Sequence, residues 1–318
     1  MTNKEKYRRL CEQESTIPIF SQAWWLDAVA GDNWDVCIVE KGDKIQATMP
    51  YVVQKKFGLT LLIQPKLTQT LGPWLRSSTA KYSKQLSQQK DLMEALIDQL
   101  PKYHYFSQNW HYSNTNWLPF YWKGFEQTTR YTYVIEKTSD LERVFSDFEH
   151  SKRKNMKKSE SIIKVVFDIS AEEFYENHKM TLKKQGLEIS YSFKLFKRIY
   201  DEGYKRNQAK TIAAFDHDGN LHAALFVIWD GISAYDLIST IDPDYRTYGA
   251  ASVLIRDIIR YTSQFVNKFD FEGSMIEPVE RSFRQFGAKQ IPYFALTHRP
   301  SCWLNTVLHL KKALKGQA

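Results

Sequence analysis

The sequence predicts an α/β (α+β) protein that holds two tandem copies of one domain, each a mixed, largely antiparallel sheet flanked by helices. The first observation is a strand–turn–strand pattern that occurs twice, and the second is that the same order of further elements follows each occurrence. The third is size and composition. The chain has 318 residues, of which 43% are hydrophobic and 14% aromatic, so it can form two apolar cores.

The repeat begins with a pair of predicted hairpins. Residues 36–54 (VCIVEKGDKIQATMPYVVQ) and residues 211–229 (TIAAFDHDGNLHAALFVIW) each contain two strand-like runs around a turn with Gly and Asp. These residue types tolerate a positive φ, as tight hairpin turns require. A third strand-like run follows each hairpin, at 59–64 and at 233–240.

The two copies continue in parallel after the third strand. A turn at 67–73 corresponds to a turn at 244–250, and helices are predicted over 83–100 and 250–265. Each copy then has a short strand and ends on a Gly, a Gln and an aromatic strand (KGFEQTTRYTYVI and FGAKQIPYFALT). Repetition on this scale indicates two copies of one fold and not a solenoid of short repeats.

The predicted domains are residues 1–137 and 138–318. The join lies near residues 136–142, where Asp140 or Ser139 can cap the helix that follows. In one arrangement the last helix of the chain packs back on the first domain.

The formal net charge is +8 and the sequence pI is about 9.1. This balance favours anionic partners, which are a phosphate-bearing cofactor, RNA or an anionic membrane surface, and it does not choose among them. No apolar leader begins the chain, and the longest apolar run, 223–229, is far shorter than the roughly 20 residues that span a bilayer, so a cytoplasmic protein is expected. No DNA partner is expected, and the oligomeric state is open.

Metal binding is not expected. The three cysteines are widely spaced, and neither a C-x-x-C nor an H-E-x-x-H pattern occurs. His217 and His222 fall in the second hairpin and are interpreted as surface or packing residues.

A basic run, HSKRKNMKKS, follows the predicted join and contains no acid. One interpretation is a solvated helix face, and the other is a patch that faces the phosphates of a ligand. On the second interpretation Lys152 and Arg153 contact the substrate.

The turn RTYGAA (246–251) precedes a well-patterned helix, and small residues occupy its start. Small residues let a ligand approach the backbone, and the free N–H groups at a helix start favour an anion. Neither a G-x-x-x-x-G-K-[ST] loop nor a G-x-G-x-x-G fingerprint occurs, so nucleotide P-loop and dinucleotide sites are not supported.

The pattern R-x-x-G-x-A resembles the [QR]-x-x-G-x-[GA] pyrophosphate turn of GNAT-type acyltransferases. The tandem layout resembles the Fem-like and BioF2-like branch of that superfamily, as do FDFEGS (269–274), FRQFGAKQIPY (283–293) and the Trp-containing FSQAWWLDAV (20–29). The likeness covers nearly the whole chain, although the coiled-coil arm of some Fem proteins is missing. It implies a bacterial-type acyltransferase that binds the diphosphate of acyl-CoA, without a metal, at these residues: Ile238, Thr240, Arg246, Thr247, Tyr248, Gly249, Ala250 and Ala251.

The first copy has TQTLGPW at the equivalent turn. Pro73 follows the Gly and lacks a backbone N–H, and the aligned Arg is missing. We therefore expect only the second copy to hold a donor, with a degenerate site in the first.

Two carboxylates are the catalytic candidates. The resemblance places the donor beside strand 233–241, which carries Asp236, and Glu272 ends the strand across from it. Glu272 is a candidate general base or amine ligand; alternatively it caps the next helix or pairs with Arg281 or Arg284. Asp236 is either catalytic or a structural hydrogen-bond acceptor. The acceptor-side candidates are Tyr191, Tyr235 and Ser274.

Three functions remain open at this level. The first is N-acyl transfer from acyl-CoA (acetyl-CoA) to an amine acceptor, which is a small molecule or a cell-envelope precursor. The second is a Fem-like transferase that takes an aminoacyl group from tRNA to a cell-wall precursor. The third is a non-catalytic binding protein on a decayed acyltransferase fold.

Overall fold

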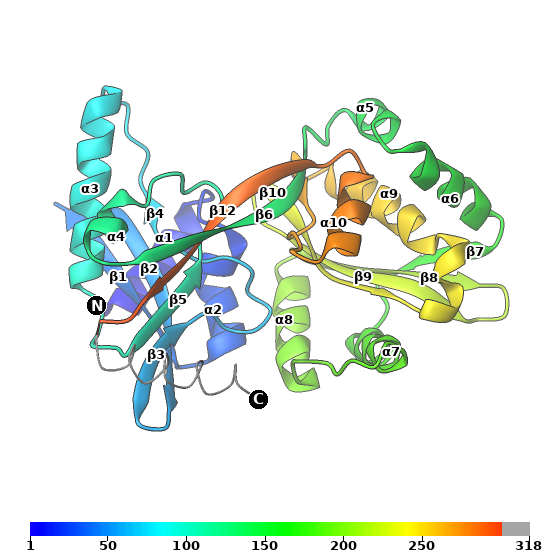
Figure 1. Cartoon of the computed structure of the whole chain (residues 1–318), viewed down its shortest axis with the longest axis horizontal. Helices are drawn as coiled ribbons and strands as arrows, with labels where there is room; N and C mark the ends of the chain where they lie inside the picture. Colours follow the sequence, from blue (N-terminus) through cyan, green and yellow to red (C-terminus); the bar gives the residue numbers. More distant parts are fainter. Residues whose placement is uncertain (301–318) are drawn as a thin grey trace, which may run out of the picture. The chain divides into compact units, whose positions relative to one another are not determined.

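The computed structural model describes residues 1–300, which form two compact units (Figure 1). Unit 1 comprises Met1–Arg130 with the described residues from Pro292 onward, and unit 2 comprises Tyr131–Ile291. Both divisions fall inside strands, β6 (Glu126–Glu136) and β12 (Lys289–His298).

Unit 1 contains four helices, a 3₁₀ turn and a sheet within its described residues. Its helices are α1 (Asn3–Gln13), η1 (Ile19–Ser21), α2 (Ala23–Ala30), α3 (Tyr82–Asp98) and α4 (Leu118–Trp122). Its own strands are β1 (Trp34–Lys41), β2 (Lys44–Lys56), β3 (Leu59–Ile63), β4 (Trp74–Leu75) and β5 (Tyr105–Asn109).

The sheet of unit 1 runs in the order β1–β2–β3–β5–β12, with β4 on β2. β1, β2 and β3 are antiparallel neighbours, β3 and β5 are parallel, and β12 is antiparallel to β5. Apolar side chains fill both sides of it, with Trp34 and Leu26 in one cluster and Phe106 and Trp110 in the other.

Unit 2 repeats this plan. Its helices are α5 (Leu141–Ser146), α6 (His150–Glu160), α7 (Ala171–Lys184), α8 (Phe193–Lys205), η2 (Pro243–Tyr248), α9 (Ala250–Thr262) and α10 (Glu277–Arg284). Its own strands are β7 (Ile163–Phe167), β8 (Ala209–Asp216), β9 (Leu221–Trp229), β10 (Ser233–Ile241) and β11 (Lys268–Asp270). Asp140 caps α5 by accepting from the N–H of Arg143, as predicted.

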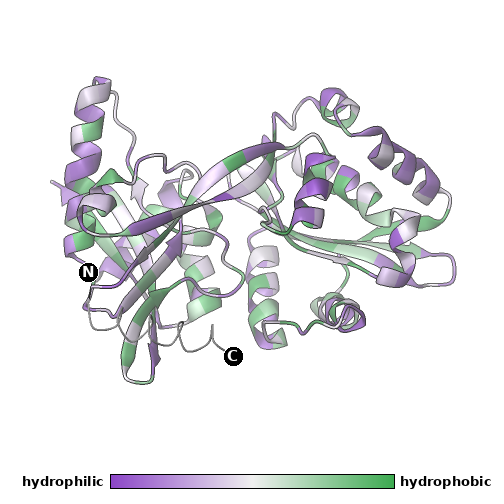
Figure 2. Cartoon of the chain, viewed as in Figure 1, coloured by the Kyte–Doolittle hydropathy of each residue, from purple (hydrophilic) through white to green (hydrophobic). Residues whose placement is uncertain are grey.

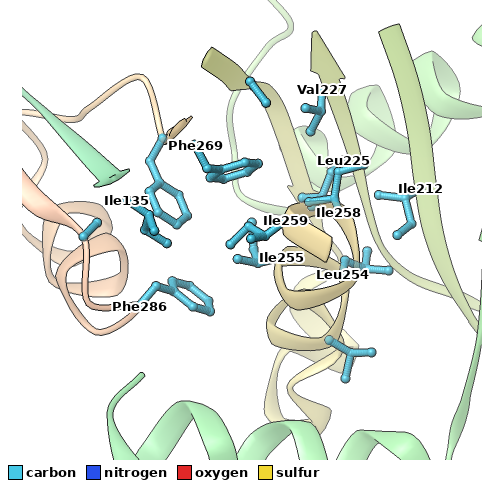
Figure 3. Close-up of a cluster of buried hydrophobic side chains, with 14 of the residues drawn as sticks. Ile135, Ile212, Leu225, Val227, Leu254, Ile255, Ile258, Ile259, Phe269 and Phe286 are labelled. Carbon is cyan, nitrogen blue, oxygen red and sulfur yellow. The ribbon is translucent and has the colours of Figure 1, made fainter. Parts of the chain in front are cut away.

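Helices cover both faces of the unit 2 sheet (Figure 1). Alternation along β9 explains the two layers, because successive side chains point to opposite faces. Leu225 and Val227 join the cluster around α9, with Ile258 and Phe269 (Figure 3), whereas Phe226 packs on the other face against Phe196 of α8. Both faces of β9 are therefore buried, in keeping with its nearly unbroken apolar sequence.

The two units show the same strand arrangement, which confirms the predicted pair of mixed, largely antiparallel sheets. Hairpin β1–β2 corresponds to β8–β9, and the parallel pair β3–β5 corresponds to β10–β11. In each unit the strand beyond the parallel pair is supplied by the other copy. β6, which ends the first copy, is antiparallel to β11 in unit 2, and β12, which ends the second, is antiparallel to β5 in unit 1.

This exchange changes the division of the chain. The units divide at Arg130, inside β6, and not after residue 137, and the chain from Pro292 returns to unit 1. Sequence order alone assigns each closing strand to the copy that precedes it, so the exchange was missed. The predicted packing of the last helix lies outside the described residues. Among residues 1–300, none of the helices has the length and apolar character needed to cross a membrane.

Candidate active site

The parallel strands β10 and β11 pair over only three residues. The register runs from Ser233 opposite Lys268 to Tyr235 opposite Asp270. β10 then continues to Ile241, while β11 ends, and the pairing of β10 with β9 shifts between Asp236 and Ile238. The edge of β10 beyond Tyr235 therefore has no β11 partner, and its backbone groups are available to a ligand.

Three buried carboxyl groups lie where the strands part. Asp236, Asp270 and Glu272 are only 6%, 4% and 8% exposed. Burial raises the pKa of Asp236 and of Asp270 to about 6, and it raises the pKa of Glu272 well above its usual value. The charges of Asp270 and Asp236 raise the pKa of Glu272 further, so the three groups form one electrostatic cluster.

Hydrogen bonds distinguish the members of this carboxyl cluster. Asp270 accepts from the hydroxyl of Thr132 and from the N–H of Glu272 at 2.8 Å. Asp236 Oδ2 accepts from Ser239 Oγ at 2.6 Å, and its buried Oδ1 has no partner among the described residues. Asp270 is therefore held by its neighbours, whereas Asp236 has one oxygen available to a ligand.

Glu272 is held by an unusual turn. Its φ is +59° and that of Gly273 is +70°, so both residues are left-handed. A Cβ on Gly273 would lie 2.1 Å from the carbonyl oxygen of Tyr131 in β6, so only glycine fits. The strained pair Glu272–Gly273 turns the carboxyl group towards the cluster, a placement typical of functional sites.

Tyr235, predicted to contact the acceptor, is buried and bonded to a neighbouring carboxylate in this structure. Its hydroxyl donates to Asp230 Oδ2 at 2.9 Å, and Asp230 Oδ1 accepts from the N–H groups of Ile232 and Ser233. This network fixes the start of β10, immediately before the strands part.

The predicted phosphate turn is η2 followed by the start of α9. Gly249 has φ +81°, and a Cβ on it would lie 2.7 Å from Cβ of Asn155 in α6. Gly249 and Ala250 are buried, whereas Arg246 and Thr247 are exposed. The absence of a side chain at Gly249 thus allows α6 to pack closely against the helix start, a contact that the sequence did not indicate.

Helix α6 also supplies hydrogen bonds to this turn. Lys158 Nζ donates to the carbonyl of Thr247 at 2.9 Å and lies over the ring of Tyr248, while the hydroxyl of Ser159 donates to the carbonyl of Tyr248. A cation from the basic run is therefore next to the turn, beside the exposed Arg246.

Ile238 and Thr240, predicted to line the donor site, are both buried. The hydroxyl of Thr240 bonds Thr181 Oγ1 at 2.7 Å and Asn177 Oδ1 at 3.2 Å, both in α7. Its side chain is thus engaged with α7, and only the backbone of β10 is left for a donor at this position.

Tyr191 precedes α8 and is buried against α7. Its hydroxyl lies 2.8 Å from Nδ1 of His178, and its carbonyl accepts from the hydroxyl of Tyr175. Burial lowers the pKa of His178 to about 4 and raises the pKa of Tyr191, so both are neutral near pH 7.

The remaining candidates lie around α10 and α6. Ser274 Oγ accepts from the N–H of Ile276 at 3.0 Å. Lys152 donates to Ser282 at 2.8 Å and lies 4.3 Å from the ring centroid of Phe286, and Arg153 donates to the carbonyl of Ser146. No described contact brings Lys152 or Arg153 to the carboxyl cluster.

In unit 1 the chain itself occupies the equivalent of the opening. The pairing of β3 with β5 ends at Ile63 opposite Ser107, and the following segment returns to make a parallel bridge between Leu71 and Trp110. The N–H of Leu71 donates to the carbonyl of Asn109 at 2.7 Å, and Gly72 lies against the Trp110 ring.

The interpretation of Pro73 is wrong. Pro73 leads into β4, and α3 begins only at Tyr82, so the proline is not at a helix start. In the first copy the segment with β4 lies between the turn and helix α3, whereas in the second copy α9 follows the turn directly. The similar sequences of the two turns gave no sign of this difference. The first copy differs instead because residues 64–73 fill the place where β3 and β5 part.

Sequence reasoning missed Thr132, which lies in β6 and bonds Asp270. It also did not name Asp270 as a site residue; the signal that could have found it is a second acid, two residues before Glu272, on a strand of Phe residues. Residues 1–300 contain no group of three or more His, Cys, Asp and Glu arranged to hold a metal ion.

Comparison with known proteins agrees with this architecture. Residues 125–274 match the family described as an acetyltransferase (GNAT) domain. A search of curated proteins finds no match. The fold resembles that of FemX, with a TM-score of 0.68 at 11% identity over 92% of this chain and 96% of FemX.

Two further structures share the fold. L-PGS from Bacillus licheniformis gives a TM-score of 0.55 at 10% identity, over 96% of each chain. A tandem GNAT protein from the clavulanic acid biosynthesis pathway gives 0.53 at 10% identity, over 94% of this chain and 96% of that one. Residues 125–274 therefore match a GNAT acetyltransferase domain, and the whole chain shares its fold with FemX and with the tandem GNAT protein.

Proposed function

We propose that the protein is an N-acyltransferase that moves an acyl group from acyl-CoA to an amine acceptor, and that unit 2 binds the donor. The observation that carries this proposal is the cluster of three buried carboxyl groups at the point where β10 and β11 part. Acyl transfer to an amine requires removal of a proton from the amine, and carboxylates with a raised pKa are suited to accept it.

The cluster favours a cation. Asp236, Asp270 and Glu272 all have a raised pKa because they are buried, and the charges of Asp270 and Asp236 raise that of Glu272 further, so a positively charged group between them would lower all three pKa values. An acceptor that arrives as an ammonium ion meets this requirement. Its charge lowers the pKa of the carboxyl groups and prepares one of them to take its proton.

The two predicted catalytic residues have different roles in this proposal. Asp236, with its available Oδ1, takes the proton from the ammonium. The amine nitrogen then attacks the thioester carbonyl carbon, the C–N bond forms and the C–S bond breaks. Glu272 holds a proton because of its high pKa and gives it to the leaving thiolate, and its carboxylate then takes the second proton that the nitrogen loses as the amide forms.

The donor phosphates are assigned to the turn at the start of α9. Arg246 and Thr247 are exposed there, and Lys158 of α6 lies beside them. A helix start with nearby cations favours a diphosphate. The unpaired edge of β10 leads from this turn to the carboxyl cluster, so a donor extended along the strand would place its thioester near Asp236.

Transfer from aminoacyl-tRNA to a cell-wall or lipid acceptor is the second candidate. Helix α6 carries Lys154 and Lys157 on an exposed face, and the fold is shared with FemX and L-PGS. An aminoacyl group also carries an ammonium that suits the carboxyl cluster. RNA binding through several phosphates weakens steeply with salt, whereas binding of one CoA changes less.

Binding measurements with CoA, acetyl-CoA and bulk tRNA, each at two salt concentrations, separate these functions. Saturable CoA binding that Arg246→Ala weakens supports the acyl-CoA proposal. The matched control is Arg260→Ala, an exposed arginine in the last turn of α9, the helix that follows the turn. Binding of tRNA without CoA would replace the first candidate by the second, and binding of neither would leave a non-catalytic role.

A further inference from the structure

We propose that the α6–α10 surface of unit 2 docks on an anionic lipid bilayer. This surface consists of three apolar side chains, Met275, Ile276 and Val279, and five basic ones, Arg153, Lys154, Lys157, Arg281 and Arg284. The inference does not depend on the proposed reaction, because it concerns groups outside the carboxyl cluster.

The apolar part of the α6–α10 surface is unusually exposed. Met275 is 62% exposed, Ile276 is 64% exposed, and Val279 is 37% exposed. Helix α10 has no fully buried residue. Its inward-facing side chain is Phe283, which stacks on Phe271, whereas the three apolar side chains of the surface are exposed. Adjacent exposed aliphatic side chains at one tip are costly in water and indicate a partner that covers them.

The basic part lies on one face of α6. Lys157 lies three residues after Lys154 and four after Arg153, so it neighbours both on the exposed side of the helix, and Figure 2 shows the hydrophilic character of this helix. Lys154 and Lys157 make neither an ion pair nor a hydrogen bond with any residue of the described chain. Arg281 extends the positive charge along α10, whereas Arg284 pairs with Glu280 at 3.5 Å, and the exposed acids Glu149 and Glu277 oppose this charge.

Direct contacts hold the two helices together. Lys152 Nζ donates to Ser282 Oγ at 2.8 Å, and the N–H of Glu149 donates to the carbonyl of Gln285 at 2.9 Å. Phe148 packs edge-on against Phe286. The basic face of α6 and the apolar tip of α10 therefore belong to one rigid edge of unit 2.

This combination fits a bilayer better than RNA. Aliphatic side chains gain free energy by entering the boundary between headgroups and acyl chains, and basic side chains around them are attracted to anionic headgroups. RNA-binding surfaces use aromatic side chains for stacking, and the exposed tip has none. The net charge of +8 acts in the same direction as the local charge.

Vesicle sedimentation with the full chain tests the docking. The protein is expected to sediment with vesicles of phosphatidylcholine and phosphatidylglycerol, and not with phosphatidylcholine alone. Lys154→Glu/Lys157→Glu should lower the partition coefficient by at least roughly 30-fold, since each basic residue near such a surface contributes a factor of about five. Met275→Ser/Ile276→Ser should lower it by roughly tenfold.

The matched controls are Lys179→Glu/Lys183→Glu on α7 and Ile232→Ser in the β9–β10 turn, which change exposed residues elsewhere in unit 2. Both should sediment as the unchanged protein does. Equal losses in control and test variants, or no binding to anionic vesicles, would overturn the proposal. Binding of bulk tRNA that depends on Lys154 and Lys157 but not on Met275 and Ile276, without vesicle binding, would assign the surface to RNA instead.

Discussion

Tyr235 and Asp270 are the last residues that β10 and β11 hold in register, and the chemistry changes on passing them. Before this pair the two strands belong to one continuous sheet, with Tyr235 bonded to Asp230. After it, β10 presents Asp236 and a backbone edge that β11 no longer pairs, while β11 gives way to the turn that holds Glu272. The end of strand pairing thus determines where a donor can lie and where the carboxyl groups gather.

Replacement of Asp236 should remove the acidic limb of the pH–rate profile. Because burial raises the pKa of Asp236 to about 6, the group becomes a usable base as the pH rises through 6. Asp236→Asn should lower kcat/KM by roughly 10²- to 10⁴-fold, and the remaining kcat/KM, which reports the groups of the substrate-free protein, should no longer rise near pH 6. The measurement is thiol release from acetyl-CoA with a panel of primary amines, between pH 5 and 9.

Asp218→Asn, in the exposed β8–β9 turn, is the control for this experiment and should keep the full profile. An Asp236→Asn protein with an unchanged rise near pH 6 would assign the base to another group. In that case Asp270, whose pKa is also raised to about 6, becomes the next candidate.

Asp270→Asn should stabilise the protein at alkaline pH. The pKa of Asp270 is higher in the folded chain, so the native state binds more protons than the unfolded one, and stability from this group is lost as the pH rises from about 4 through 6. An amide oxygen can still accept from Thr132 and from the N–H of Glu272. The gain in the free energy of unfolding at pH 8 should be roughly 3 kcal/mol.

Denaturant unfolding of both proteins at pH 5 and pH 8 checks this sign. The variant should gain more stability relative to the unchanged protein at pH 8 than at pH 5, where roughly half of the effect is already present. A loss of stability that is equal at both pH values would show that the hydrogen bonds of the Asp270 side chain stabilise the fold more than the burial of its charge destabilises it.

The sequence predicted the architecture well because the repeat and the hairpins are local patterns. It could not predict the exchange of β6 and β12, since any closing strand with a suitable apolar face can pair with either sheet. At the site, the sequence proposed Glu272 from its place at the end of a strand and Asp236 from its place on the strand before the turn, and the structure brings both into the carboxyl cluster, while their catalytic roles stay predictions.

The contacts between elements distant in sequence were not predictable. Thr132 reaches Asp270 from another copy of the repeat, and Asn155 fits against Gly249 only because α6 crosses the start of α9. Pro73 shows a different kind of error. The sequence predicted a turn there, but β4 lies between this turn and helix α3, so Pro73 is not at the helix start.

Gly273→Ala should be far more damaging than a glycine replacement in open space. A Cβ at Gly273 would lie 2.1 Å from the carbonyl oxygen of Tyr131, whereas Gly219, also left-handed with φ +85°, has no atom within 4 Å of the same position. Gly219→Ala should cost about 1 kcal/mol for the backbone conformation, and Gly273→Ala should cost roughly 3 kcal/mol or more. Denaturant midpoints provide the comparison, and similar costs for both would show that β6 moves aside freely.

The strand exchange makes a prediction about fragments. A chain of residues 1–137 keeps β6 but lacks β12, so the edge of β5 that pairs with Ala295–His298 loses its partner and the cluster around Phe106 loses Leu296. This fragment should show no cooperative unfolding transition alone. Addition of residues 138–318 supplies β12 and should restore the transition, because the exchanged strand need not be covalently joined to the first copy. The control is residues 138–291, which lack most of β12 and should not restore it. A fragment 1–137 that unfolds cooperatively alone would show that β6 can close the sheet of unit 1 in place of β12.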